Sequence, residues 1–251
     1  MAIALRKKDE INKLRRAGAI VGQTLEFLKD QVKPGMSLKE VDSLGEEFLR
    51  KLGAEPSFKG LYGFPSAVCT SVNEVIIHGI PTDYKLKDGD ILGIDIGSKI
   101  DGYFGDAAIT IPVGEISLND QKLIECAKDS LFYAIEAIKA GMRFKELSKI
   151  IEEKIKSYGF VPLRDYCGHG IGKKPHEEPN VLNYVEGKVN QGPKIKNGMV
   201  FCIEPMVAQK DPHPVVLNDN WSVVSQDGLN GSHYEHQVAI VDGKAQILTL
   251  P

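Results

Sequence analysis

The stretch Asp90-Ile-Leu-Gly-Ile-Asp-Ile-Gly97 has the pattern of a buried strand, yet it carries an aspartate, Asp95, in its middle. A second stretch of the same form, Met199-Val-Phe-Cys-Ile-Glu-Pro205, carries Glu204 in the matching place. An ionised carboxylate in apolar surroundings is costly unless a cation or hydrogen bonds compensate it. Because the same anomaly occurs twice, we infer that one positive object lies between the two strands. A metal site is the simplest explanation.

Both stretches belong to an internal repeat. Residues 33–41 resemble residues 139–147 at an offset of 106, and residues 86–95 align without gaps with residues 195–204 at an offset of 109. A period near half the chain is too long for a solenoid. It predicts a duplicated α+β unit (helix, helix, then strands that end in an acid) with pseudo-two-fold symmetry. Chance similarity of helix starts is the alternative, and the second, independent match around the acids argues against it.

The bulk properties exclude several classes of protein. The chain has 251 residues and a formal net charge of −3, so no overall charge favours nucleic acid or an anionic membrane. No apolar run approaches the roughly 18 residues of a membrane span, and the first residues lack the apolar core of a secretory signal. The four cysteines are far apart, without a Cys-x-x-Cys pattern, which favours reduced thiols in a cytoplasmic protein.

Hydrophobic periodicity predicts the order of the elements. A helix is expected over 9–31, and Ser37-x-x-Glu40 is a capping box that starts a second helix. Two more helices are expected from Ser117 and from Phe144. Strands are expected over 67–71, 75–78, 90–97 and 102–112, with a hairpin turn at Ser98–Gly102. The remainder, 160–251, is predicted to form strands and loops, with surface loops at 188–196 and 209–220.

Three further residues complete a candidate metal site. Asp106 follows Asp95 by eleven residues, a spacing that can bring two acids side by side on antiparallel strands. Two adjacent carboxylates repel each other unless a metal lies between them. Glu235 is a fourth acid in a strand-like run, and His169 is flanked by glycines that permit close approach. Four carboxylates and one imidazole suit two first-row divalent ions better than a structural zinc.

Taken singly, each of these residues has a plainer interpretation. A lone aspartate in a strand is more often structural, and so is a lone histidine beside glycines. The run Gly168–Gly172 also resembles a phosphate loop but lacks the strand–GxxxxGK[ST]–helix context. The five residues together favour the metal site. His78 and His176 are candidates for donating to an oxyanion or holding an amide nitrogen. The remaining histidines are interpreted as structural: His213, His233 and His236.

The basic start, Arg6–Arg16, has two interpretations. It is the solvated face of the first helix, which we favour on general grounds, or it contacts ribosomal RNA.

Seven motifs span essentially the whole chain: Val72–Pro81, Gly89–Gly97, Gly102–Asp106, Cys167–Gly172, His176–Pro179, Gly198–Pro205 and Tyr234–His236. Together they resemble the type I methionine aminopeptidases, in their short bacterial form, of the pita-bread metallopeptidase superfamily. This resemblance implies an α+β fold in which helices cover an antiparallel sheet. It also implies a single catalytic domain over 1–251, with internal halves of about 10–115 and 116–251.

The resemblance assigns roles to the candidate residues. The family's five metal ligands fall on Asp95, Asp106, His169, Glu204 and Glu235. The implied activity removes the initiator methionine from nascent chains whose second residue is small, by attack of a metal-bridging hydroxide on the scissile carbonyl. Glu204 would take the proton of the attacking water, His176 would stabilise the oxyanion, and His78 would orient the scissile amide. Cobalt, manganese, iron and zinc all tolerate this ligand set.

The same resemblance implies a pocket for the methionine side chain. Its substrate-binding residues would be Cys69, Phe64, Leu61 and Trp221, beside His78 and His176. Leu61 and Phe58 stand where Tyr and Cys can occur in the family, and Pro175 stands where an aromatic residue is common, so the shape of the pocket is left open. A monovalent-cation site is implied near three other residues: Asn73, Val75 and Gly231.

Three rival functions were weighed. An X-Pro aminopeptidase or prolidase shares the five ligands but usually carries a domain ahead of the catalytic one. A type II methionine aminopeptidase has a helical insertion, for which the stretches 176–204 and 204–235 are short. A non-catalytic binding protein on this scaffold typically loses metal ligands, and this chain keeps all five. The expected partners are nascent polypeptides with an N-terminal methionine, with transient ribosome contact as an open alternative and no membrane or specific nucleic acid.

Overall fold

The centre of the fold is a long antiparallel hairpin. The computed structural model describes residues 3–251, and in it β4 (Ile91–Ile100) pairs with β5 (Tyr103–Pro112) over their full lengths. The expected turn at Ser98–Gly102 is too long, because Ser98 and Lys99 remain in the strand ladder. The actual turn is Asp101-Gly102, and both residues have positive φ, as a two-residue type I′ hairpin requires.

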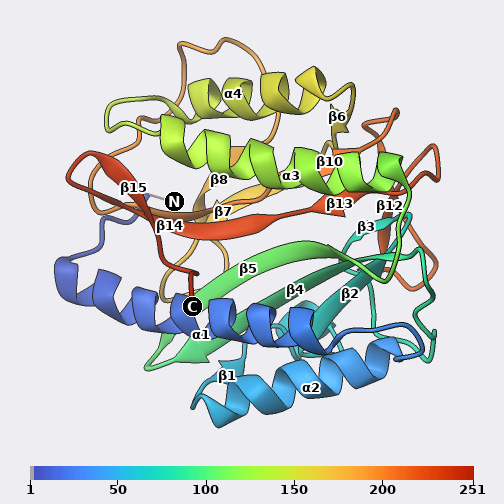
Figure 1. Ribbon diagram of the computed structural model, residues 1–251. Coiled ribbons are helices and arrows are strands. Elements are labelled where there is room, and N and C mark those ends of the chain that lie inside the picture. Colours follow the sequence, from blue (N-terminus) through green and yellow to red (C-terminus); the bar gives the residue numbers. More distant parts are fainter. Residues whose placement is uncertain (1–2) are drawn as a thin grey trace.

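The remaining strands extend this hairpin into a curled sheet. The other elements of the main sheet are β1 (Glu55–Pro56), β2 (Val68–Val72), β7 (Cys167–Gly170), β8 (Glu177–Leu182), β9 (Val200–Ile203), β14 (Glu235–Val241) and β15 (Lys244–Ile247). The strand order is β1-β4-β5-β14-β9-β7-β8, with β2 beside β4 and β15 beside β14, and the pairings are antiparallel. The antiparallel α+β fold expected from the sequence is therefore confirmed (Figure 1).

Short strands and one 3₁₀ turn surround the sheet. They are η1 (Leu61–Gly63), β3 (Val75–Ile77), β6 (Val161–Pro162), β10 (Met206–Ala208), β11 (Pro214–Val216), β12 (Val223–Ser225) and β13 (Ser232–His233). β11 lies inside 209–220, so the prediction of a loop throughout that segment is wrong: residues 214–216 pair with 223–225.

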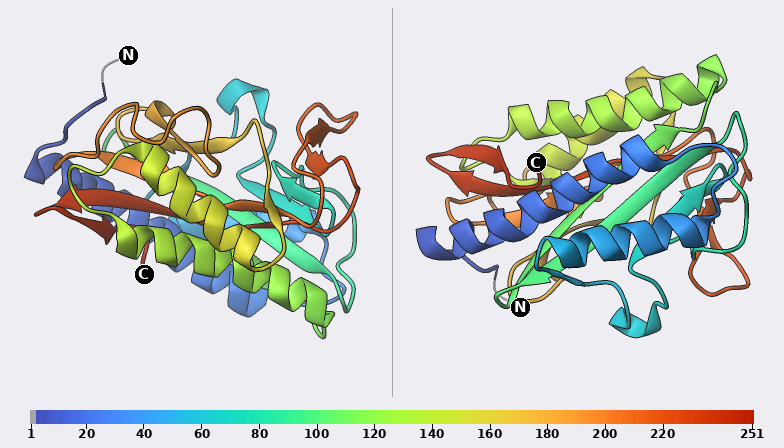
Figure 2. Two further views of the ribbon diagram at one scale, coloured as in Figure 1. Left: turned by 90° about the horizontal axis from the view of Figure 1, so that it is seen from above. Right: turned by 60° about the horizontal axis from the view of Figure 1, so that its bottom comes forward.

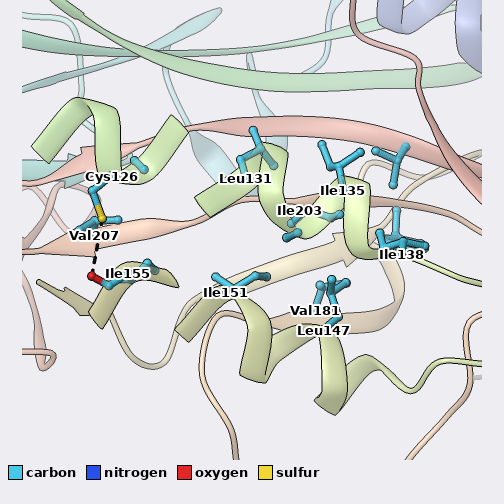
Figure 3. Close-up of a cluster of buried hydrophobic side chains, with 14 of the residues drawn as sticks. Cys126, Leu131, Ile135, Ile138, Leu147, Ile151, Ile155, Val181, Ile203 and Val207 are labelled. Carbon is cyan, nitrogen blue, oxygen red and sulfur yellow. Dashed lines mark hydrogen bonds between the residues drawn. The ribbon is translucent and has the colours of Figure 1, made fainter. Parts of the chain in front are cut away.

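The helices cover the sheet in two pairs. α1 (Lys8–Gln31) and α2 (Leu38–Lys51) lie side by side over β2, β4 and β5 (Figure 2, right), and α3 (Leu118–Ala137) and α4 (Phe144–Ser157) cover the other half (Figure 1). Each pair has its own apolar core, because the amphipathic faces point to the strands of their own half. Figure 3 shows the α3–α4 cluster, to which Leu131 of α3, Ile151 of α4 and Ile203 of β9 belong. None of the helices within residues 3–251 is long and apolar enough to cross a bilayer.

Matching hydrogen bonds show the internal duplication in three dimensions. The N–H of Gly35 donates to the carbonyl of Leu86 (2.7 Å), and the N–H of Gly141 donates to that of Ile195 (2.9 Å). These two pairs are separated by the same offsets, 106 and 109, that relate the repeats in the sequence. Both glycines have positive φ, as their positions after the first helix of each pair require. The two halves therefore share backbone geometry as well as sequence.

Candidate metal centre and substrate pocket

Strand register places the candidate acids on one face of the sheet. Asp95 of β4 and Glu235 of β14 both lie opposite Ala108 of β5, and Asp106 is two residues from Ala108 on the same strand. Directly opposed residues, and residues two apart, share a face of a sheet. Glu204 follows β9, the next strand beyond β14, so all four acids converge on the middle of the sheet.

The five candidate ligands form a tight group. Carboxylate oxygens of Asp95, Asp106 and Glu235 lie within 4.8 Å of one another. His169, on β7, points its Nε2 at the same place, 3.6 Å from Oε1 of Glu204 and 3.9 Å from Oδ2 of Asp106. Residues from both halves of the chain therefore contribute ligand atoms to a single centre.

The centre has the electrostatic signature of a cation site. One oxygen on each acid is buried without a hydrogen-bond partner among the described residues: Asp95 Oδ1, Asp106 Oδ1, Glu204 Oε1 and Glu235 Oε1. Burial raises the pKa of Asp95 to about 7, and burial together with the neighbouring carboxylates raises the pKa of Asp106, Glu204 and Glu235 well above the ordinary range. Clustered, unpaired acid oxygens are stable as anions only with cations between them, so this donor set fits divalent metal ions.

The hydrogen bond of His169 fixes the tautomer in which Nε2 is free to bind a metal. Its Nδ1 lies 3.0 Å from the carbonyl of Gly170, which can only accept, so Nδ1 carries the proton and Nε2 offers a lone pair to the centre. Burial lowers the pKa of His169 to about 3, so the ring is neutral at neutral pH.

A cavity of about 400 Å³ opens directly onto the acids. The predicted site residues that line it are Asp95, Asp106, His169, Glu204, Glu235, His78, His176, Cys69, Phe64, Leu61 and Trp221. Phe58, expected at the rim, lines it as well. The structure therefore brings the candidate ligands and the candidate substrate-binding residues together in one cavity.

The apolar end of the cavity is an aromatic corner. The rings of Phe64 and Trp221 meet edge to face with centroids 5.1 Å apart, and Cys69 belongs to the same cluster. Cys69 lies opposite Asp95 in the β2–β4 ladder, so the aromatic corner is directly adjacent to the cluster of acids. A thioether packs well against aromatic edges, and the corner suits an unbranched, sulfur-containing side chain.

Two further histidines, His78 and His176, line the cavity beside the acids. The ring of His176 meets the ring of His169 edge to face, with centroids 4.4 Å apart. His78 has positive φ and contacts the ring of Tyr166. Burial lowers the pKa of both imidazoles, to about 4 for His78, so both are neutral and retain one N–H donor at neutral pH.

Tyr62 and His233 are among the residues at this site that the sequence did not indicate. Tyr62, 75% exposed, stacks on His176 with centroids 5.8 Å apart and lines the cavity. His233, interpreted as structural, is buried with its Nε2 3.8 Å from Oε2 of Glu204. The only signal for Tyr62 was its place between Leu61 and Phe64, and His233 is two residues from Glu235.

At the implied cation site, the N–H of Gly231 donates to the carbonyl of Asn73 (3.0 Å).

Clustered acids and one imidazole at a cavity form the site of a metal-dependent hydrolase such as a metallopeptidase. A thiol, that of Cys202, lies beside Glu235, but burial raises its pKa well above the usual range and so keeps it protonated and unreactive. Metallopeptidase family M24 matches residues 12–242, and the chain belongs to that family. A methionine aminopeptidase of Helicobacter pylori is 58% identical over 251 residues, covering 99% of each chain. The chain is accordingly an aminopeptidase, a hydrolase of peptide bonds.

Solved structures agree with this assignment. The crystal structure of methionine aminopeptidase from Rickettsia prowazekii has a TM-score of 0.96 and 32% identity, covering 99% of this chain and 100% of that one. The prolidase from Pyrococcus furiosus has a TM-score of 0.80 and 27% identity, covering 98% of this chain and 65% of that one. The pita-bread fold is thus common to both kinds of peptidase, and the stronger likeness is to the methionine aminopeptidases.

Proposed function

We propose that this aminopeptidase removes the initiator methionine from nascent polypeptides whose second residue is small. The observation that carries the proposal is the aromatic corner of Phe64 and Trp221, which lies in the same 400 Å³ cavity as the five candidate ligands. A methionine side chain held in that corner would present its carbonyl to the acids. A small second residue is proposed because the stacked rings of Tyr62 and His176 line the cavity beside the candidate ligands. We place this activity in the cytoplasm and in one domain, 1–251, with halves of about 10–115 and 116–251.

The proposed ligands of two divalent ions are Asp95, Asp106, His169, Glu204 and Glu235. Asp95 would hold one ion, His169 and Glu204 would hold the other, and Asp106 and Glu235 would serve both. When bound, two such ions would supply a hydroxide near neutral pH and would polarise the scissile carbonyl. Cobalt, manganese, iron or zinc would suit the set. A monovalent cation near Asn73, Val75 and Gly231 belongs to the same proposal.

The chain's own residues supply the proton transfers and the positioning. Glu204, whose Oε1 is buried without a hydrogen-bond partner among the described residues, takes the proton of the attacking water. His176 donates its N–H to the oxyanion that develops on the carbonyl oxygen. His78, across the cavity and neutral, holds the scissile amide. Because the rings of His176 and His169 are in contact, the oxyanion donor lies at the edge of the ligand group, as this assignment requires.

The direct test is methionine release from a Met-Ala-Ser peptide by metal-stripped protein titrated with manganese or cobalt. Release that depends on metal supports the proposal. An Ala-Pro peptide serves as the control for the prolidase-like relatives, and preference for that bond would overturn the substrate assignment.

Matched variants test the assigned residues. Glu204→Ala and His169→Ala are expected to abolish turnover while the fold survives. His213→Ala is the control, because His213 is an exposed imidazole paired only with Asp211. Wild-type turnover in either site variant would contradict the ligand assignment, and a large fall in the melting temperature would show that the metal is structural.

Transient ribosome contact through the basic start is the remaining partner proposal. Arg15 donates to Gln246, and Arg16 pairs with Asp101, with both side chains of the latter pair more than half exposed. Charge reversal of both arginines should reduce co-sedimentation with ribosomes if the contact exists. Unchanged co-sedimentation would remove it.

A further inference from the structure

The segment ahead of α1 lies against the loop that carries His176. The backbone N–H of Arg6 donates to the carbonyl of Gly198 (2.6 Å), which anchors the segment. From there the guanidinium of Arg6 forms an ion pair with Glu177, and the two side chains are only 10% and 17% exposed. Sequence analysis placed Arg6 on a solvated basic face. In the structure it is a part-buried partner of Glu177, the residue that follows His176.

Glu177 in turn fixes the backbone of its own loop. Its Oε1 accepts hydrogen bonds from the backbone N–H groups of Lys173 (2.9 Å) and Lys174 (3.1 Å). The carboxylate therefore closes the turn 173–177 through its Oε1, and the guanidinium of Arg6 compensates its charge at the other oxygen, Oε2. Gly172 allows the approach, because a Cβ at that position would overlap the guanidinium. Glu10 adds a weaker link, 3.5 Å from Nζ of Lys173.

We infer that Arg6 is a positioning residue for His176: through Glu177 it holds the loop 173–177 so that the imidazole stays against His169 at the cavity. The inference rests on the proposed function, which gives His176 its role in the reaction. It assigns the N-terminal segment a part in catalysis that depends on geometry and not on substrate contact.

A positioning role, beyond simple stability, follows from where the ion pair lies. A surface ion pair contributes little, whereas removing one partner of a buried pair leaves an uncompensated charge that must move toward water. Here the carboxylate that would move belongs to Glu177, the residue directly after His176 in the chain. Displacement of a catalytic group by about 1 Å can cost roughly 100-fold in rate. A local shift of the loop would therefore lower kcat more than it lowers the stability of the fold.

The first test is Arg6→Met, which keeps the apolar stem and removes the charge. We expect kcat on Met-Ala-Ser to fall about 10- to 100-fold with a change in KM of less than about 3-fold, because the methionine corner is untouched. Arg6→Lys should recover part of the loss. Glu177→Gln, which retains an acceptor for the two N–H groups, should cost less than Arg6→Met. Arg16→Met is the matched control, since Arg16 makes an exposed pair with Asp101, and it should stay within about 2-fold of wild type.

A double-mutant cycle separates positioning from general destabilisation. If Arg6 acts through His176, Arg6→Met should cause no further loss of kcat in a His176→Ala background, because there is no imidazole left to misplace. A full additional loss in that background would overturn the inference, and so would wild-type kcat in Arg6→Met alone.

Limited trypsin digestion gives a readout that does not depend on activity. The loop offers one cleavable bond, after Lys173, because Lys174 is followed by Pro175. Cleavage after Lys173 should be faster in Arg6→Met than in wild type and Arg16→Met, and equal rates would overturn the inference. Failure of wild type to release methionine would contradict the proposed function instead, and the digestion result would still decide whether Arg6 holds the loop.

Discussion

The Nε2 atom of His233 lies 3.8 Å from Oε2 of Glu204, and it is buried without a hydrogen-bond partner among the described residues. The separation exceeds a hydrogen bond, so a shift of less than about 1 Å would be needed to form one. Burial lowers the pKa of His233 to about 3, which keeps the ring neutral and able to carry one proton on Nε2. His233 therefore lies where it could orient the carboxylate that we propose as ligand and base.

The first prediction follows from this pair. His233→Leu should weaken metal binding about 10-fold, as loss of a residue that orients a ligand typically does, while His233→Gln, which restores an N–H donor, should recover most of it. The measurement is metal affinity by isothermal titration calorimetry. Equal affinities for His233→Leu and wild type would show that the imidazole only fills space.

The second prediction concerns the aromatic corner. Phe64→Ala should raise KM for Met-Ala-Ser by about 10- to 140-fold, because burial of one such side chain contributes about 1.5–3 kcal/mol and each 1.4 kcal/mol is a factor of ten. kcat should change less, since the acids are untouched. Tyr133→Ala is the control, because Tyr133 is an exposed aromatic on α3 outside the cavity lining. A loss confined to kcat would place Phe64 elsewhere in the reaction.

The third prediction is the release of protons when metal binds. With its pKa raised to about 7, Asp95 is mostly protonated at pH 6 and mostly ionised at pH 8.5. Asp106, Glu204 and Glu235 are shifted in the same direction, whereas His169, with a pKa of about 3, has no proton to lose from Nε2. A metal must displace the carboxyl protons, so affinity should rise with pH between 6 and 8.5.

Calorimetry in buffers of different ionisation enthalpy measures this release. At least one proton per bound metal set is expected at pH 6, and fewer at pH 8.5. No release at pH 6 would mean that these acids are ionised before metal arrives.

The fourth prediction tests the turn of the central hairpin. Gly102→Ala should lower the free energy of unfolding by about 1–2 kcal/mol, because the left-handed conformation at that position is unfavourable for a residue with a Cβ. Asp101→Asn should be nearly neutral, since asparagine tolerates positive φ and the lost pair with Arg16 is exposed. Urea unfolding of both variants provides the comparison. Equal stability of Gly102→Ala and wild type would contradict the turn assignment.

Local signals were enough to predict the scaffold. The capping box at Ser37 is present, with its Oγ accepting from the N–H of Glu40, and the expected helices and central strands form at or within a few residues of their predicted positions. The error at Ser98 has a physical cause, because its hydroxyl donates to the carbonyl of Ala17 in α1. This hydrogen bond between distant segments gives the Ser98 hydroxyl a partner inside the strand. The alternation of residues along one strand cannot predict such a bond.

The candidate site was harder to predict in full. Acids in apolar strands stand out because their burial needs compensation, so Asp95 and Glu204 could be identified from the sequence. No comparable sequence pattern distinguishes three other residues: Tyr62, His233 and Arg6. Their places depend on how the sheet curls and on which distant segment docks beside a loop, and neither is encoded in local periodicity.

The matched backbone bonds of Gly35 and Gly141 lie at equivalent places within the two halves, and the equivalent acids Asp95 and Glu204 line one cavity at the seam between those halves. Two identical subunits would be forced to place the same side chains on both sides of such a seam. Once one chain carries both halves, each side can change alone. The half with β7 can then contribute an imidazole, His169, and the half with β2 a thiol, Cys69, so that a cluster of acids becomes a site with a fixed direction for its substrate.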